Sequence, residues 1–553
     1  MMEEMITIRC VNDGKKYKVA EGSSLLEIGS QIMPDKMKEF VVGKVNNRVE
    51  GLTVRVYNNS DVEFSGISSP FGMRTYTRTL LFILSKAVSN LYKGVSVSVE
   101  APISNGYYIC LRHSHGRIID AADVRKEMDK LIAQDLLFVQ ERKPADEVIE
   151  MYERAGMMSK VKLLRSTGRL YTTYYTLDGY PDNYYGALCP STGYVKLFGL
   201  ENYYEGLLLR LPDPVVPGKL KPAIKQEKMF EVFKIHHRLH ELGGVRTIGD
   251  LNEVCAQGYT NDIINVSEAF QERQICHMAE DIVAKRTIKM VLVAGPSSSG
   301  KTTFSKRLSV QLMTCGYRPV PISLDDYFVP RSQTPLDEKG DYDYETIDAL
   351  NLPLLAEHLQ QLFDGKDVEL PRYDFVTGES VPSGNHLKLS PHDIVVIEGI
   401  HALNPRLTEV IDDLYKYKIY VSALTTIQLD NHNYISPGDN RLMRRIVRDA
   451  QFRGSSAKDT IRRWPSVRAG ERKWIIPFQE DVDVMFNSAL VYELAGLKSQ
   501  VMPLLEMVPE YEPEYGEAFR LLKLLRYINP INIGGTPQPS LLREFLGGSV
   551  FHY

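Results

Sequence analysis

The sequence predicts an α/β protein whose C-terminal half folds as a doubly wound parallel sheet, with two smaller domains before it. Three observations predict this fold class. From about residue 288, short apolar segments alternate with helix-like segments, as in a parallel sheet covered by helices. Residues 5–65 alternate short apolar runs with turns, which is typical of a small β-grasp-like module. Residues 67–212 mix amphipathic helices with tyrosine-rich strands, as in an α+β domain.

A chain of 553 residues is too long for one hydrophobic core, so several domains are expected. A Pro/Gly cluster at 212–218 is a plausible boundary. We predict a β-grasp-like domain at 1–66, an α+β domain at 67–212, a mostly helical linker at 213–287 and a nucleotide-binding domain at 288–553. Within the linker, the pattern over 268–286 predicts one long helix that leads into the first strand of the parallel sheet.

The composition predicts a cytoplasmic protein without a membrane anchor. Its net charge of −4 provides no overall field for binding polyanions, so any contact with nucleic acid would be local. The six cysteines are scattered without a C-x-x-C pair, which fits reduced thiols. The N-terminus is acidic, and no apolar run approaches the roughly 18 residues of a membrane span.

The most informative segment is the apolar run 291–294, which leads directly into G-x-x-x-x-G-K-T and then into a helix-like stretch. In this context the pattern predicts a phosphate-binding loop of the P-loop NTPase type, and hence ATP and Mg²⁺ as cofactors. Backbone N–H groups would face the phosphates, Lys301 would reach the β- and γ-phosphates, and the Thr302 hydroxyl would bind Mg²⁺. The predicted ATP-binding residues are Gly295, Ser297, Ser298, Ser299, Gly300, Lys301, Thr302 and Thr303.

Two further apolar runs end in carboxylates, where the ligands of such sheets bind. Asp325 follows the run 321–324 and is the candidate general base and a candidate metal-side acid. The alternative reading is that Asp325 and Asp326 only cap a helix, and we favour that reading for Asp326. Glu398 follows the run 394–397, in the layout of an acid that holds Mg²⁺ directly or through water.

Arginines gather at helical spacing between residues 440 and 454, and Arg441, Arg445 and Arg448 fall on one face. Guanidinium groups suit phosphate oxygens, so we predict a lid that closes over the transferring phosphoryl group. The alternative is a solvated basic helix.

With these motifs in order, residues 288 to about 490 resemble the uridine kinase and phosphoribulokinase family. The stretches 340–349 and 371–375 resemble the segments of that family that contact the nucleoside, and 398–400 resembles its metal-side acid. The resemblance implies transfer of the γ-phosphoryl group of ATP to the 5′-hydroxyl of a ribonucleoside. It assigns catalysis to Asp325, Lys301 and Arg448, metal binding to Thr302, Glu398 and Asp325, and substrate contacts to Glu345, Tyr344, Tyr373, Arg445, Arg448 and Arg453.

Two departures from the family bear on substrate choice. Glu345 stands where the family has its ribose-binding Asp, so the hydroxyl contacts are expected with a shifted geometry. Val376, Thr377 and Gly378 follow the Y-D-F motif, where uridine and cytidine kinases have a histidine that contacts the pyrimidine. The sequence therefore does not identify the nucleobase of the acceptor. A third departure is Ser455, which stands where the family lid has a further arginine.

The N-terminal half resembles two parts of threonyl-tRNA synthetase: residues 5–65 a TGS domain, and residues 67–212 the second additional, or editing, domain. When the synthetase motif is aligned with residues 182–193, its metal-binding Cys falls on Tyr184 and its metal-binding His on Leu188. The two histidines of the R-H-x-x-x-H motif of the synthetases fall on Thr75 and Thr79. We therefore expect no metal and no deacylase activity. The pairs His113/His115 and His236/His240 are expected to be structural or solvent-facing.

Alternatives stay open at this stage. The enzyme could phosphorylate another sugar or a sugar phosphate, or the chain could be an RNA-binding regulator that uses nucleotide binding as a switch. The N-terminal half could bind tRNA or another RNA, sense a ligand, or build a homo-oligomer. The basic stretches 112–117 and 160–169 are the candidate RNA contacts.

Overall fold

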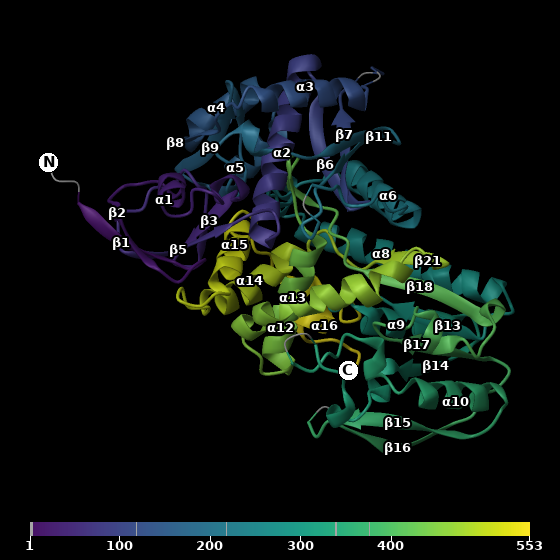
Figure 1. Cartoon of the computed structure of the whole chain (residues 1–553). Helices are drawn as coiled ribbons and strands as arrows, with labels where there is room; N and C mark the ends of the chain where they lie inside the picture. The colour runs from purple at the N-terminus through teal and green to yellow at the C-terminus, as the bar shows by residue number, and fades with distance from the viewer. Residues whose placement is uncertain are drawn as a thin grey trace.

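The structure is a computed structural model, and it describes residues 4–114, 116–117, 119–216, 218–337, 340–374 and 376–552. His115 and Phe375, which the sequence analysis named, lie outside these residues. In Figure 1 the N-terminal half occupies the upper part of the molecule, and the C-terminal parallel sheet lies below it. Among the described residues, no helix combines the length and apolar character needed to cross a bilayer.

The first sheet has five strands in the order β2-β1-β5-β3-β4. They are β1 (Met5–Cys10), β2 (Lys16–Ala20), β3 (Val42–Val45), β4 (Arg48–Glu50) and β5 (Ser60–Ser65). The pair β1 and β5 is parallel, whereas the other pairs are antiparallel. One helix, α1 (Leu25–Ile32), begins at a capping box made by Ser24 and Glu27, and its buried face shares a core with this sheet.

The next part of the chain packs helices against two antiparallel sheets. One sheet has the order β11-β12-β7-β6 and the other β10-β9-β8. Their strands are β6 (Ser96–Ile103), β7 (Gly106–Arg112), β8 (Val139–Pro144), β9 (Tyr171–Leu177), β10 (Tyr180–Asp182), β11 (Gly199–Tyr203) and β12 (Gly206–Arg210). The long helix α2 (Pro70–Leu91) shares a core with the first of these sheets, and α3 (Ala121–Ala133), α4 (Ala145–Arg154) and α5 (Met158–Thr167) complete this part.

Three helices connect this part to the parallel sheet: α6 (Glu227–Gly243), α7 (Ile248–Ala256) and α8 (Thr260–Ala284). The helix predicted over 268–286 is the second half of α8, which begins eight residues earlier. Its N-terminal turns were missed because Thr260, Asn261 and Asp262 carry no apolar periodicity.

The predicted parallel sheet is confirmed. Its order is β14-β17-β13-β18-β21, and every neighbouring pair runs parallel. The strands are β13 (Met290–Ala294), β14 (Arg318–Ser323), β17 (Asp393–Glu398), β18 (Lys416–Ser422) and β21 (Val484–Asn487). All five residues of β13 are buried, because helices cover both faces of the sheet. The helix α9 (Lys301–Thr314) follows β13 directly.

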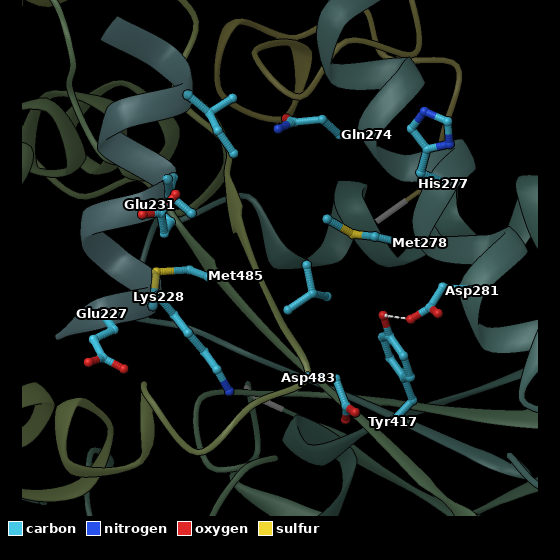
Figure 2. Close-up of a pocket in the computed structure, with 13 residues that line it drawn as sticks. Glu227, Lys228, Glu231, Gln274, His277, Met278, Asp281, Tyr417, Asp483 and Met485 are labelled. Carbon is cyan, nitrogen blue, oxygen red and sulfur yellow. Dashed lines mark hydrogen bonds between the residues drawn. The ribbon is translucent and has the colours of Figure 1, made fainter. Parts of the chain in front are cut away.

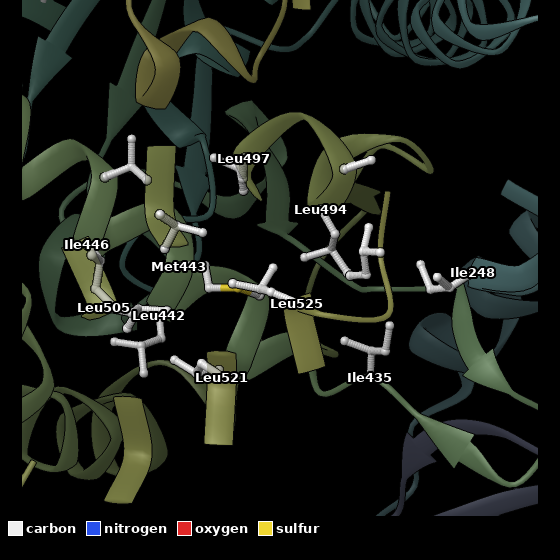
Figure 3. Close-up of a cluster of buried hydrophobic side chains, with 14 of the residues drawn as sticks. Ile248, Ile435, Leu442, Met443, Ile446, Leu494, Leu497, Leu505, Leu521 and Leu525 are labelled. Carbon is white, nitrogen blue, oxygen red and sulfur yellow. The ribbon is translucent and has the colours of Figure 1, made fainter. Parts of the chain in front are cut away.

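The remaining elements surround this sheet. The helix α10 (Leu352–Phe363) precedes the hairpin of β15 (Val368–Asp374) and β16 (Glu379–Leu387), and β17 is followed by the short helix α11 (Pro405–Thr408). A second hairpin, β19 (Gln428–Asp430) and β20 (Asn433–Tyr434), leads to α12 (Pro437–Phe452), α13 (Ala457–Trp474), α14 (Glu493–Glu506), α15 (Tyr515–Leu525) and α16 (Arg543–Leu546). The largest apolar cluster lies between α12, α14 and α15 (Figure 3), and it includes the fully buried Leu442, Met443, Leu497, Leu505 and Leu525.

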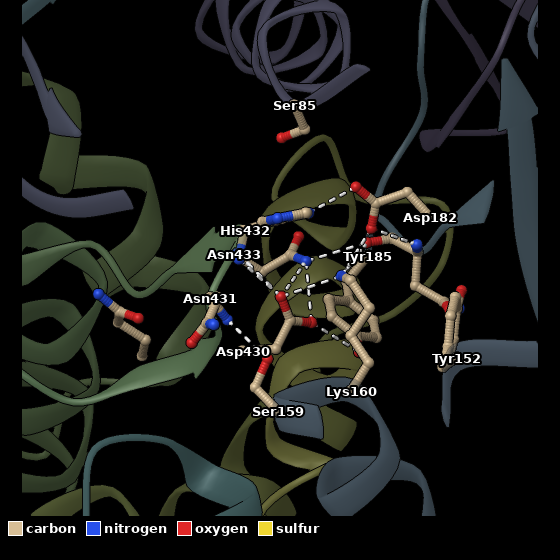
Figure 4. Close-up of polar contacts among 12 residues, drawn as sticks. Ser85, Tyr152, Ser159, Lys160, Asp182, Tyr185, Asp430, Asn431, His432 and Asn433 are labelled. Atoms are coloured by element: carbon tan, nitrogen blue, oxygen red, sulfur yellow. Dashed lines mark hydrogen bonds and ion pairs between the residues drawn. The ribbon is translucent and has the colours of Figure 1, made fainter. Parts of the chain in front are cut away.

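A buried ionic network joins the N-terminal half to the hairpin β19–β20 (Figure 4). Lys160 Nζ lies 2.6 Å from Asp182 Oδ1 and 3.1 Å from Asp430 Oδ1, and His432 Nδ1 lies 2.6 Å from Asp182 Oδ2. Burial alone would raise the pKa of Asp182, but His432 and Lys160 outweigh it and lower that pKa to about 2. Asp182 therefore stays charged, and the two halves share one set of buried charges.

Candidate active site

The phosphate loop lies between the central strand β13 and the N-terminus of α9. A Cβ on Gly295 would collide with the carbonyl oxygen of Val421, so this position requires glycine. Gly300 has φ +84°, a left-handed conformation that glycine adopts without strain, and α9 begins at the next residue. The start of a helix presents backbone N–H groups that its own carbonyl groups do not use, so the start of α9 can bind an anion.

Thr302 and Glu398 come together at the end of the sheet. The Thr302 hydroxyl donates to Glu398 Oε1 at 3.0 Å, because β13 and β17 are neighbours and Val293 is in register with Glu398. The other oxygen, Glu398 Oε2, is buried and has no hydrogen-bond partner among the described residues. Burial raises the pKa of Glu398 to about 7, although Lys301 acts in the opposite direction. A hydroxyl and a carboxylate with an unused oxygen fit Mg²⁺, which favours oxygen ligands.

Asp325 follows β14, the strand next to β17, and its side chain reaches solvent. Its backbone N–H donates to Ser323 Oγ at 3.3 Å. The surrounding protein raises the pKa of Asp325, while Lys301, Arg453 and Arg448 lower it in part. Asp326 is held differently, since its Oδ1 accepts from the Tyr373 N–H at 3.3 Å. This contact is with strand β15, and the short helix at 324–327 is capped by Ser323, so Asp326 does not have the helix-capping role that we favoured for it.

Glu345 and the two tyrosines predicted with it lie beside these groups. The Glu345 side chain packs against Gly470 of α13, and burial raises its pKa to about 7 against the opposing effect of Arg445 and Lys301. Tyr344 and Tyr373 both pack on Phe328, with ring centroids 5.9 and 5.6 Å apart. Lys301 is thus close enough to act on three carboxylates, those of Asp325, Glu345 and Glu398.

The helix α12 lies against the phosphate loop through three arginines. Arg445 donates to Ser297 Oγ at 2.9 Å, Arg441 to Ser297 O at 3.0 Å, and Arg444 to Ser298 O at 3.4 Å. Arg441 is only 3% exposed and is paired with Glu471. Arg441 and Arg445 both reach Ser297, as residues on one face of α12 can, but Glu471 of α13 covers Arg441.

Arg448 and Arg453 lie further along α12. Both are near Asp449, with Arg448 Nη2 at 2.9 Å and Arg453 Nε at 3.8 Å from Asp449 Oδ1. The Arg453 side chain is 56% exposed. Of the predicted lid arginines, Arg441 and Arg445 donate hydrogen bonds directly to the phosphate loop.

Four residues near the loop were missed by the sequence analysis. Glu544 of α16 accepts from the Thr303 hydroxyl at 2.6 Å and from the Thr303 N–H at 3.3 Å. Arg444 pairs with Glu493 and also holds Ser488, whose hydroxyl donates to Ser299 O. Their partners lie 44 to 241 residues away in sequence, so no local pattern could have revealed them.

The fourth missed residue is His401, three residues after Glu398. It is 2% exposed, and burial lowers the pKa of its imidazole to about 4, so the ring is neutral at physiological pH. The sequence offered one signal for His401, its position directly after the Glu398-Gly399-Ile400 motif.

The positions that replace the metal ligands of the synthetases are buried. Tyr184 packs on Phe82 with ring centroids 5.4 Å apart, and the Thr79 hydroxyl accepts from the Cys189 N–H while donating to Thr75 O. Leu188 is part of the same apolar core. In the described part of the chain, no group of three His, Cys, Asp or Glu side chains is arranged to hold a metal ion.

A groove of about 500 Å³ lies away from this site, between α6, α8 and the edge of the sheet at β18 and β21 (Figure 2). Its walls carry Glu231, Asp281 and Asp483, and Tyr417 Oη donates to Asp281 Oδ2 at 2.6 Å. None of the predicted site residues lines this groove.

Comparison with known proteins gives the following matches. The model of the Phosphoribulokinase / Uridine kinase family matches residues 290–494. A uridine kinase of Lactobacillus johnsonii is 30% identical over 203 residues, which are 36% of this chain and 87% of that protein. A uridine kinase of Ligilactobacillus salivarius is 31% identical over 207 residues, 37% of this chain and 87% of its own.

Among solved structures, a possible uridine kinase from Bacillus stearothermophilus is 21% identical over 39% of this chain and 98% of its own, with a TM-score of 0.26. The sequence matches confirm the resemblance of the C-terminal half, whereas the family match does not extend over residues 1–289.

Proposed function

We infer that this chain, which belongs to the phosphoribulokinase / uridine kinase family, functions as a nucleoside kinase-like phosphotransferase with an alcohol acceptor. One observation carries the assignment beyond family membership. Asp325, Glu345, Glu398 and Arg445 all lie around Lys301, at the edge of the sheet where parallel strands end. This is the set of groups that moving a phosphoryl group to a hydroxyl requires.

We propose ATP as the donor and Mg²⁺ as its metal ion. Lys301 and the N–H groups at the start of α9 would bind the phosphates, and Arg445, Arg448 and Arg453 would neutralise the transferring group. The Thr302 hydroxyl and Glu398 would hold Mg²⁺, with Asp325 close enough to contribute, and the ion would neutralise charge on the phosphates.

Asp325 is our candidate for the general base that accepts the proton of the acceptor hydroxyl. Its neighbours Lys301, Arg448 and Arg453 favour the charged form, and its access to solvent leaves room for a substrate. Lys301 and Arg448 complete the proposed catalytic group.

A ribonucleoside, phosphorylated on its 5′-hydroxyl, is the acceptor that we propose. Glu345 would accept hydrogen bonds from the ribose hydroxyls, and Tyr344 and Tyr373 would flank the nucleoside. No histidine is present at 376–378 to read a pyrimidine.

A sugar phosphate is the second candidate acceptor, and one contact favours it. Gly378 lies in the segment where uridine and cytidine kinases have their pyrimidine-binding histidine, and it packs against Arg331. A Cβ at Gly378 would lie 2.8 Å from Arg331 Nε. A guanidinium group at this point suits an anionic acceptor better than a neutral base.

For the rest of the chain we propose a TGS-like domain at 1–66, an editing-like domain without metal ligands at 67–212, a helical linker at 213–287 and the kinase domain at 288–553. Support comes from the five-stranded sheet with one helix that ends at Ser65, and from the burial of Tyr184 and Leu188. A cytoplasmic location, RNA binding and self-association remain hypotheses of the sequence analysis.

The test is ATP consumption by the purified full chain with Mg²⁺ against ribonucleosides, deoxyribonucleosides and sugar phosphates, with product masses measured. Turnover of a ribonucleoside supports the first candidate, and turnover of a sugar phosphate alone supports the second. ATP binding without transfer to any of these acceptors would contradict both, and salt-sensitive tRNA binding in the same sample would favour the nucleotide-switched regulator.

A further inference from the structure

A second cavity, separate from the candidate active site, lies where α6, α7 and α8 meet the segment after β21. Its volume is about 460 Å³, within the range of small-molecule sites. The lining residues are His236, Leu239, His240, Gly243, Val245, Val254, Tyr259, Asp262, Ile263, Val266, Ser267, Phe270, Gln271, Ala489, Leu490 and Val491. None of them belongs to the proposed kinase machinery.

The walls of this cavity are apolar and partly aromatic. Phe270 and His236 form an edge-to-face pair with ring centroids 5.2 Å apart, and Tyr259 lies at the mouth with 55% of its surface exposed. Leu490 and Val245 are buried at the inner side. Such walls favour a flat, largely apolar molecule that stacks on or meets the edges of rings.

Two buried polar atoms in the lining have no hydrogen-bond partner among the described residues: Gln271 Oε1 and His240 Nδ1. Gln271 is 1% exposed, and its Nε2 donates to Asn487 O and Ala489 O at 3.4 and 3.3 Å, which leaves Oε1 as an unused acceptor. His240 is 7% exposed, and its other nitrogen, Nε2, lies 3.5 Å from Thr426 Oγ1. A buried acceptor without a donor is costly, and a ligand with an N–H group would satisfy it.

The charge of the lining defines the ligand further. Among the described residues that line the cavity, Asp262 is the one with a full charge, because burial keeps His236 and His240 neutral. No lysine or arginine is present to bind a phosphate or a carboxylate. An anionic ligand would therefore lose its hydration without gaining a partner.

We propose that this cavity binds an uncharged, planar heteroaromatic molecule of nucleobase size that donates an N–H hydrogen bond to Gln271 Oε1. The site differs from the acceptor site around Glu345, and it needs no phosphate group on its ligand.

The cavity is connected to the phosphate loop through one short segment. Gln271 holds the carbonyl groups of Asn487 and Ala489, on either side of Ser488. Ser488 donates its hydroxyl to the loop carbonyl of Ser299 and accepts from Arg444. A ligand that hydrogen bonds to Gln271 therefore acts on the residue that fixes the phosphate loop, and it changes the affinity for ATP.

Benzimidazole is a suitable probe, because it is flat and neutral above about pH 7 and carries one N–H donor. Its charged counterpart is benzimidazole-5-carboxylate. Binding to the full chain is measured by calorimetry and by ligand-observed NMR, and the expected dissociation constant for so small a probe is on the order of 0.1–1 mM. This readout requires no kinase activity, so its failure is distinguishable from failure of the proposed function.

Gly243 provides a matched pair of variants. It lies at the end of α6 and lines the cavity, and a Cβ there would meet nothing within 4 Å, so Gly243→Ala displaces no neighbour. Gly243→Phe is expected to fill the cavity and weaken benzimidazole binding at least about tenfold, whereas Gly243→Ala is expected to bind like the wild type. Should Gly243→Phe fail to fold, Val266→Trp replaces it, since Val266 is 57% exposed at the mouth.

The coupling is tested by titrating ATP with and without saturating benzimidazole. The expected result is a change in the ATP dissociation constant of at least about threefold in the wild type and in Gly243→Ala, and no change in Gly243→Phe. The proposal is overturned if none of benzimidazole, adenine and uracil binds at millimolar concentration. It is also overturned if Gly243→Phe binds as well as the wild type, or if the carboxylate binds as tightly as benzimidazole. An unchanged ATP affinity overturns the coupling.

Discussion

Replacing Asp325 with asparagine is the most direct test of the assignment of the general base. The substitution keeps the shape of the side chain and removes its charge. Within the described part of the chain the Asp325 carboxylate makes no hydrogen bond, and only its backbone N–H is fixed, by Ser323. Folding should therefore change by no more than about 0.5 kcal/mol.

The effect on turnover is expected to be large. A positioned general base contributes about 10²- to 10⁴-fold, which corresponds to roughly 3–5 kcal/mol of the activation barrier. ATP affinity should stay nearly unchanged, because Lys301, Thr302 and the N–H groups of α9 remain in place. The pH profile offers a second readout: the protein raises the pKa of Asp325, and the base works only when charged, so wild-type turnover should fall as pH drops through that pKa.

Asp326→Asn is the matched control. Asp326 accepts from the Tyr373 N–H, and an asparagine oxygen can do the same, so turnover is expected within about threefold of the wild type. The assay is single-turnover phosphoryl transfer with ATP binding measured in parallel. If Asp325→Asn kept more than about a tenth of wild-type turnover, the base would have to be another group; loss of ATP and Mg²⁺ binding instead would make Asp325 a metal ligand.

Further predictions concern affinity, pH and stability. The KM for the acceptor should fall as pH rises through about 7, because Glu345 becomes charged there. The Glu345→Gln variant should lose this pH dependence of KM. If the variant kept the wild-type pH profile of KM, Glu345 would not belong to the acceptor site. Glu544→Gln should tighten ATP binding about three- to tenfold in calorimetry, because it removes a negative charge from Thr303 at the N-terminus of α9, and equal or weaker binding would contradict this. Leu525 is fully buried, so Leu525→Ala should lower the free energy of unfolding, measured in urea, by about 2–5 kcal/mol. The control Leu242→Ala should lower it by less than about 0.5 kcal/mol, because Leu242 is 80% exposed. Similar losses in both variants would contradict the packing of the core.

The parallel sheet and its edge could be predicted because their signals are local. Residues 290–294 and 394–397 are continuous apolar runs, since both faces of these strands are covered. Glu398 directly follows the second run, the phosphate loop with Lys301 follows the first, and Asp325 follows β14, so the ends of neighbouring strands bring these residues to one edge. Each of these placements depends on a few consecutive residues.

The contacts around the loop could not be predicted in the same way. The spacing of arginines in α12 identified a face, but not that α13 would cover Arg441 with Glu471. Glu544 reaches Thr303 across 241 residues, and nothing near either residue indicates the pair. Such contacts depend on how the helices pack, which hydrophobic periodicity leaves undetermined.

The N-terminal half shows a similar limit. The loss of the metal ligands could be read position by position, but no local pattern indicated that the hairpin β19–β20 would supply Asp430 and His432 to the motif that begins at Asp182. The residues involved are separated by about 250 positions. A pattern search within either half cannot find a network that exists only between them.

That network also has a consequence for the history of the chain. An ancestor that once joined a kinase to an unrelated N-terminal module could have discarded the module while their surfaces were separate. Once Lys160 was buried between Asp182 and Asp430, separating the two halves would take the lysine away from Asp430 and expose to water the surfaces that now enclose it. From then on the stability of each half depended on the other, whether or not the N-terminal module ever acquired a chemistry of its own.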